Sequence, residues 1–166
     1  VKYTIDIFKR YNTMLWDCKM RYGKTVTAYE LLKRQGYKKV IVITHRPAVE
    51  DSWGSDHDLI FGDGDHLFID KTQNTSYVYD DKIDYQNDCK LKQVIADGTP
   101  FVYFASIQDL RGSTRVGGKF NKNNAVFDTD WDLLIVDEAH EGTATDLGDA
   151  VINNIRKPNT KVLLLS

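Results

Sequence analysis

The chain has 166 residues with 22 basic and 24 acidic side chains, which give a formal net charge of −2. This length fits one domain, and an apolar content of 42% excludes a disordered chain. No apolar run reaches the roughly 18 residues that a membrane helix needs, and no signal-peptide pattern opens the chain. The two cysteines, Cys18 and Cys89, form no metal-type pair, which favours a reducing, cytoplasmic location.

Short continuous apolar runs alternate with helical patterns along the chain. Strands are expected at 13–16, 40–43, 101–105, 133–136 and 162–165, and helices at 24–35, 47–56, 85–96 and 146–155. The first of these helices carries Lys33 and Arg34 in its last turn and Gly36 just beyond it, which is a helix-stop signal. Continuous apolar runs are typical of strands buried on both faces. The pattern therefore predicts an α/β fold with a mainly parallel central sheet flanked by helices.

Two stretches depart from this alternation. Residues 57–84 are polar and rich in Asp, and they are interpreted as an insertion with one short hairpin formed by 66–69 and 76–79. Residues 111–127 combine Gly, Ser and Asn with four basic side chains, which predicts a flexible basic loop. The chain starts at Val1 and stops at Ser166, directly after an apolar run, so we expect a fragment of a longer protein.

A phosphate-binding loop is predicted at 18–25, in the sequence CKMRYGKT between a strand and a helix. Amide groups at a helix N-terminus favour a bound phosphate, and Gly23 lets the backbone approach it closely. Lys24 can reach the β- and γ-phosphates, and Thr25 offers a hydroxyl to Mg²⁺. Cys18 stands where the motif has its first glycine, and Gly-Lys-Thr alone is equally consistent with an ordinary helix start.

Two carboxylates follow the apolar strand at 133–136, namely Asp137 and Glu138. Ligands of open α/β sheets bind at the carboxyl ends of the strands. Asp137 is therefore suited to hold Mg²⁺ and Glu138 to activate a water molecule. An acidic surface turn is the alternative interpretation, and the phosphate-binding loop upstream argues against it.

The segments CKMRYGKT at 18–25 and DEAH at 137–140 together resemble the first RecA-like motor domain of superfamily 2 helicases and translocases. They are most similar to the type III restriction enzyme Res subunit family. The resemblance implies the nucleotide-binding residues Met20, Arg21, Tyr22, Gly23, Lys24 and Thr25. It implies that Lys24 and Glu138 are catalytic and that ATP and Mg²⁺ are the cofactors. It further implies that Thr25 and Asp137 hold the metal, and that His140 couples the nucleotide site to DNA.

The resemblance also implies a DNA-facing side. The segments at 43–47 and 104–110 look like two motifs that lie along the DNA backbone, with contacts from Thr44, Arg46, Ser106 and Gln108. The sequence departs from the family pattern at Cys18 and in residues 1–12, which lack the glutamine of an adenine-reading motif. A third motif could begin only at Ser166.

We therefore expect residues 1–166 to be the N-terminal RecA-like ATP-binding domain of a DNA-dependent ATPase of restriction type. Its implied partners are duplex DNA, a second RecA-like domain, and methyltransferase or specificity subunits. Without the second domain, nucleotide binding and hydrolysis should be weak. Two alternatives remain open: a P-loop phosphotransferase acting on a small molecule, and a non-catalytic module that binds DNA or a protein partner.

Overall fold

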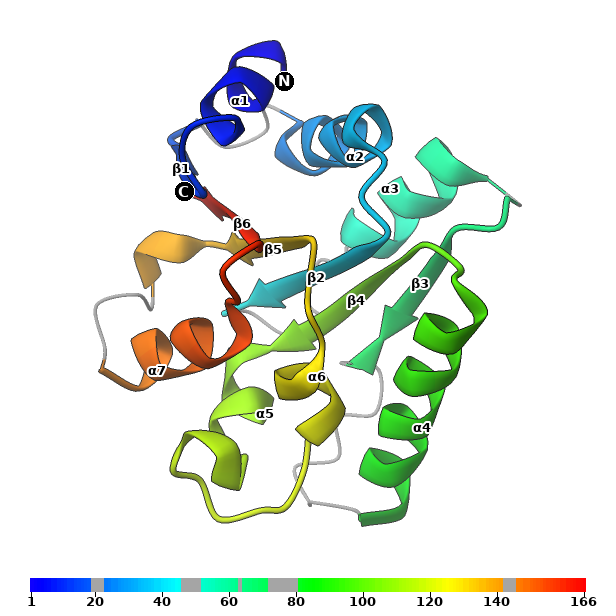
Figure 1. The fold of residues 1–166 in the computed structure, drawn as a ribbon, viewed down its shortest axis with the longest axis vertical. Helices are drawn as coiled ribbons and strands as arrows, with labels where there is room; N and C mark the ends of the chain where they lie inside the picture. Colours follow the sequence, from blue (N-terminus) through cyan, green and yellow to red (C-terminus); the bar gives the residue numbers. More distant parts are fainter. Residues whose placement is uncertain (19–22, 46–51, 63, 72–80, 142–145) are drawn as a thin grey trace.

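The computed structural model describes the chain outside residues 19–22, 46–51, 63, 72–80 and 142–145. A six-stranded sheet forms its centre, and every pair of neighbouring strands is parallel (Figure 1). The strand order is β1-β6-β5-β2-β4-β3. The strands are β1 (Thr13–Trp16), β2 (Lys39–Thr44), β3 (Leu67–Asp70), β4 (Phe101–Ser106), β5 (Leu133–Asp137) and β6 (Lys161–Leu165). The predicted α/β fold with a parallel sheet is confirmed.

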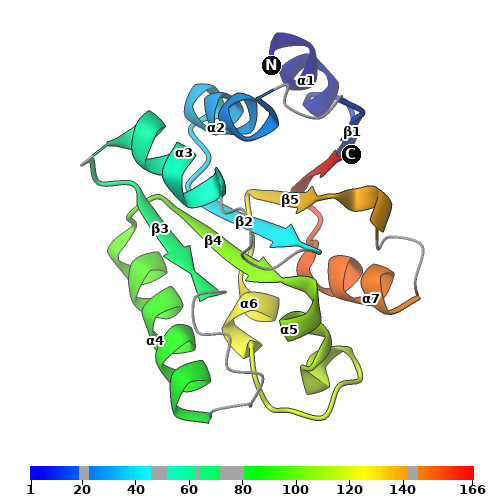
Figure 2. The ribbon, with the colours of Figure 1, turned by 180° about the vertical axis from the view of Figure 1, so that it is seen from behind.

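Helices cover both faces of the sheet, as Figures 1 and 2 show from opposite sides. One face packs against α1 (Lys2–Phe8), α2 (Lys24–Gln35) and α3 (Ser52–Phe61). The other packs against α4 (Asp81–Asp97), α5 (Ile107–Arg111), α6 (Asn124–Asp128) and α7 (Asp146–Ile155). Two short 3₁₀ segments, η2 (Thr114–Val116) and η3 (Ala139–Glu141), complete the described elements.

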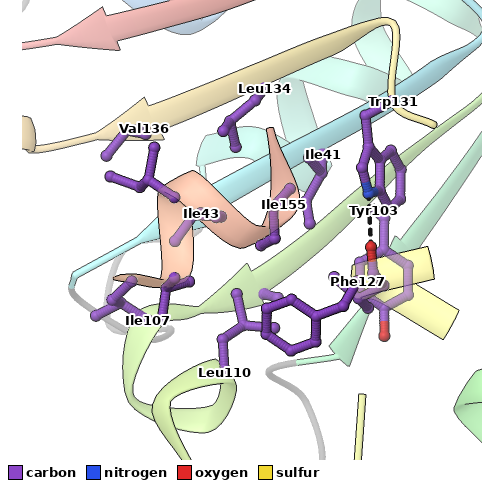
Figure 3. Packing of buried hydrophobic residues seen from close by; sticks show 14 of the residues in the cluster. Ile41, Ile43, Tyr103, Ile107, Leu110, Phe127, Trp131, Leu134, Val136 and Ile155 are labelled. Carbon is purple, nitrogen blue, oxygen red and sulfur yellow. Dashed lines mark hydrogen bonds between the residues drawn. The ribbon is translucent and has the colours of Figure 1, made fainter. Parts of the chain in front are cut away.

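Side chains of the central strands point alternately to the two faces of the sheet, so these strands contribute to a hydrophobic core on each face. In β2, Ile41 and Ile43 pack with α5, α6 and α7 on one face of the sheet (Figure 3). Val40 and Val42 point the opposite way and pack with α2 and α3. All four are fully buried, which explains why the run is apolar at every position. The sheet therefore forms a rigid support for whatever lies at the ends of its strands.

The ends of α2 follow from local sequence. Gly23 precedes the helix with φ 70° and Gly36 ends it with φ 63°, both in the left-handed region that glycine tolerates. The Gly36 amide donates to the carbonyl of Leu32, which closes the last turn as the sequence predicted. The helix expected at 146–155 also has the predicted bounds. The helix expected at 47–56 is described from Ser52 and continues to Phe61, whereas the one expected at 85–96 spans 81–97.

One arm of the predicted hairpin is described, and it lies in the central sheet. Leu67–Asp70 forms β3, which pairs in parallel with β4 at the edge of the sheet, with Leu67 opposite Phe101. The other expected arm, 76–79, lies outside the described residues. Residues 57–61 belong to α3, so the Asp-rich stretch contributes a helix end and an edge strand to the domain.

The loop predicted at 111–127 contains regular structure. This stretch contains η2 and most of α6, and the side chains of Ser113 and Asn123 are buried. Lys122 forms an ion pair with Asp109 at 2.8 Å, which fixes the second half of the segment against α5. Polar residues such as Lys122 suggested a solvated loop because the local sequence does not show their partners, which lie at other positions in the chain.

Candidate functional site

The two predicted halves of the site lie at the same edge of the sheet. Gly23 and Lys24 follow β1, and Asp137 is the last residue of β5. Strands β1 and β5 are both parallel to β6, which lies between them. Their carboxyl ends therefore face the same way, separated by one strand, and this edge is where open α/β sheets bind ligands.

Lys24 reaches towards the central strand of this trio. Its Nζ donates a hydrogen bond of 2.7 Å to the backbone oxygen of Ser166, directly after β6. The backbone N–H of Cys18 donates to the same oxygen at 3.2 Å. The backbone oxygen of Ser166 therefore accepts hydrogen bonds from Lys24, at the start of α2, and from Cys18, which follows β1. Met20, Arg21 and Tyr22, which were predicted to bind nucleotide, lie outside the described residues.

Both carboxylate oxygens of Asp137 accept a hydrogen bond. The backbone N–H of Glu138 donates to Oδ1 at 3.0 Å, and the indole Nε1–H of Trp53 donates to Oδ2 at 3.0 Å. A carboxylate oxygen can accept more than one bond, so each retains capacity for a further ligand. No local signal linked these residues, because 84 positions separate Trp53 from Asp137.

Thr25 is connected to the same part of α3. Its hydroxyl lies 3.4 Å from the hydroxyl of Ser52, the residue before Trp53. Consecutive residues of α3 therefore contact both predicted metal-binding side chains, Thr25 and Asp137. A hydroxyl and a carboxylate are hard oxygen donors that suit Mg²⁺, which usually keeps several waters and takes few protein ligands. Within the described ranges, no group of three or more His, Cys, Asp or Glu side chains could hold a metal by itself.

Glu138 has an uncommon backbone conformation and a histidine partner. Its φ is 53°, a left-handed value that costs a non-glycine residue free energy and that clusters at functional sites. Its Oε2 lies 3.4 Å from Nε2 of His140, and Nδ1 of that ring lies 3.2 Å from the hydroxyl of Ser166. His140 thus connects the predicted catalytic carboxylate to the end of β6.

The predicted DNA-facing residues lie at the ends of two paired strands. Thr44 and Ser106 are register partners at the carboxyl ends of β2 and β4. Thr44 is buried, and the Ser106 hydroxyl caps α5 by accepting the backbone N–H of Asp109 at 3.2 Å. Gln108 is exposed, and its side-chain amide donates to the backbone oxygen of His45 at 3.0 Å. Arg46 lies outside the described part of the chain.

Comparison with known proteins identifies the family. The family model described as "Type III restriction enzyme, res subunit" matches residues 19–166. The chain belongs to this family. The matched range includes Lys24, Asp137 and Glu138.

Two known proteins show the wider relationship. A Mycoplasma pneumoniae protein, provisionally described as the C-terminus of a type II restriction enzyme and methyltransferase, is 29% identical over 150 residues. That match covers 83% of this chain and 19% of the relative. The solved SWI2/SNF2 ATPase core of Sulfolobus solfataricus in complex with dsDNA is similar in fold, with a TM-score of 0.59 at 13% identity. It covers 99% of this chain, which spans 29% of that structure.

The likeness to the ATPase core agrees with the RecA-like arrangement of the sheet. The chain spans less than a third of the length of each of these two proteins. Among the helices that the structure describes, none combines the length and apolar character required to cross a bilayer.

Proposed function

We propose that residues 1–166 form the N-terminal RecA-like ATP-binding domain of a DNA-dependent ATPase of restriction type. One observation carries the proposal. Lys24 and Thr25 at the start of α2, and Asp137 and Glu138 at the end of β5, converge on one edge of the sheet. Membership of the Res subunit family supports the same conclusion.

Each side chain has a role that its chemistry supports. The ammonium group of Lys24 would leave the Ser166 oxygen and neutralise charge that develops on the γ-phosphate. Thr25 and Asp137 would hold Mg²⁺, which would supply positive charge to offset the charge of the phosphate groups. Glu138 would accept a proton from the attacking water and orient it.

His140 and Ser166 extend the site. The imidazole contacts both the Glu138 carboxylate and the Ser166 hydroxyl, so a displacement at the end of β6 would reach the water-activating group. This contact supports the predicted coupling role of His140. Gln108, which joins the ends of β2 and β4, is the exposed candidate for a contact to the DNA backbone.

The proposed partners are duplex DNA and a second RecA-like domain that closes over the nucleotide. The solved neighbour is a complex with dsDNA, and the Mycoplasma pneumoniae relative carries a methyltransferase in its description. Methyltransferase or specificity subunits are therefore further proposed partners. Efficient hydrolysis would require the second domain.

Nucleotide titration tests the proposal. Lys24→Ala should weaken ATP binding in the presence of Mg²⁺ by about 10- to 100-fold, because a hydrogen bond to a charged group contributes about 1.5 to 3 kcal/mol. Lys33→Ala is the matched control, since it removes a lysine from the exposed last turn of the same helix. Equal affinity in the parent protein and the Lys24 variant would exclude the phosphate-binding role. DNA binding without any nucleotide binding would instead support a non-catalytic module.

A further inference from the structure

The first turn of α3 contacts both sides of the proposed metal site. Ser52 lies against the Thr25 hydroxyl, and the Trp53 indole donates to Oδ2 of Asp137. Trp53 is 3% exposed, and polar groups on side chains as buried as this one are almost always paired with an acceptor. The acceptor it uses is the carboxylate that the proposed function assigns to Mg²⁺.

The Trp53 indole is also held in place by Tyr29 of α2. Its ring meets the Tyr29 ring edge-on, with centroids 5.5 Å apart and planes at 84°. The Tyr29 hydroxyl donates to the backbone oxygen of Trp53 at 2.7 Å. Tyr29 is fully buried in α2, the helix that begins at Lys24. The position of Trp53 is thus set by the same helix that carries the phosphate-binding lysine.

We propose that Trp53 is a positioning residue for Asp137. The carboxylate could rotate about its Cβ–Cγ bond, but donors on both oxygens favour one orientation: the Glu138 amide at Oδ1 and the indole at Oδ2. Such fixed carboxylates bind metals better because the orientation is set before the ligand arrives. This inference rests on the proposed function, since it assigns Mg²⁺ to Asp137.

A packing role for Trp53 makes a different prediction. The edge-on contact with Tyr29 uses the ring, whereas the contact with Asp137 uses only the N–H. Trp53→Phe retains an aromatic ring and removes the donor. A packing residue would change stability when replaced, without altering how strongly the protein depends on Mg²⁺.

The experiment measures ADP affinity by calorimetry across a series of Mg²⁺ concentrations and in EDTA. For Trp53→Phe we expect the half-saturating Mg²⁺ concentration to rise about 10-fold or more, with the affinity for ADP in EDTA unchanged. Trp131→Phe is the matched control. It removes a buried indole whose N–H donates to the Val126 backbone oxygen at 2.9 Å, in the core on the opposite face of the sheet.

The outcomes separate the two proposals. The same Mg²⁺ dependence in Trp53→Phe and the parent protein would overturn the positioning role and leave the proposed function intact. A parent protein that binds ADP no better with Mg²⁺ than in EDTA would overturn the proposed function, and the positioning role with it.

A second measurement covers the case in which Trp53→Phe does not fold. The unsubstituted protein has three tryptophans, whose indole N–H signals can be assigned by NMR using Trp16→Phe and Trp131→Phe. Adding Mg²⁺ to the ADP-bound protein should shift the Trp53 signal and leave the Trp131 signal in place. A Trp53 signal that does not move would contradict the inference.

Discussion

Lowering the pH from 7 to 5 should destabilise the fold through a pair of histidines between α3 and β3. Nε2 of His57 and Nδ1 of His66 lie 2.8 Å apart, a distance at which one nitrogen donates and the other accepts. His66 also stacks on Phe61, with ring centroids 3.9 Å apart and planes at 12°. His57 is 3% exposed. A second proton on this pair would place two charges in a largely apolar environment.

The size of the effect follows from the pKa of His66. Burial, followed by the charge of His57, lowers this pKa from 6.5 to about 4. Between these two values the unfolded chain binds a proton that the folded protein does not, so stability falls as the pH falls. Going from pH 7 to pH 5 should remove about 2 kcal/mol of unfolding free energy. Burial also lowers the pKa of His57, despite the opposing effect of Asp58, and this adds to the loss.

Urea denaturation followed by circular dichroism at pH 7 and pH 5 measures this loss. In His66→Asn the amide can still form a hydrogen bond with His57 but has no proton to gain in this range. We expect the variant to lose less than half as much stability as the parent protein between the two pH values. An equal loss in His66→Asn and the parent would refute the reasoning.

Two further substitutions test how the domain is held together. Lys71→Met should cost about 3 kcal/mol in urea unfolding, because the Lys71 side chain is 6% exposed and its ammonium lies 2.7 Å from Asp84 and 2.8 Å from Asp109. Its removal takes away the cation beside Asp84, whereas Asp109 keeps its ion pair with Lys122. Lys119→Met, at an exposed position, is its control, and similar midpoints for the two variants would contradict the role of the ion pairs. Gly36→Ala should cost about 1 kcal/mol in thermal unfolding, because φ is 63° while an added Cβ would meet no atom within 4 Å. An unchanged melting temperature would show that the helix end adjusts without strain.

The sequence was sufficient for the parts of the fold that depend on local pattern. The apolar runs predicted β2 and β5 within a residue of each end, and the glycine after two basic residues predicted the end of α2. A parallel sheet brings the ends of such strands to one edge, so the placement of Lys24, Asp137 and Glu138 at that edge was also predictable. The apolar patterns repeat along the chain, and the residues that end α2 lie within one helical turn of each other.

Tertiary packing decided the rest, because the contacts join residues far apart in the chain. β3 pairs with β4, and Lys122 is fixed by Asp109 rather than solvated. The indole of Trp53 reaches Asp137 across 84 positions, a distance at which residue type alone gives no information. The sequence by itself determined which residues could carry the chemistry. Only the packing of α3 against α2 and the sheet decided that the Trp53 indole donates to Asp137, because the two residues become neighbours only in the folded chain.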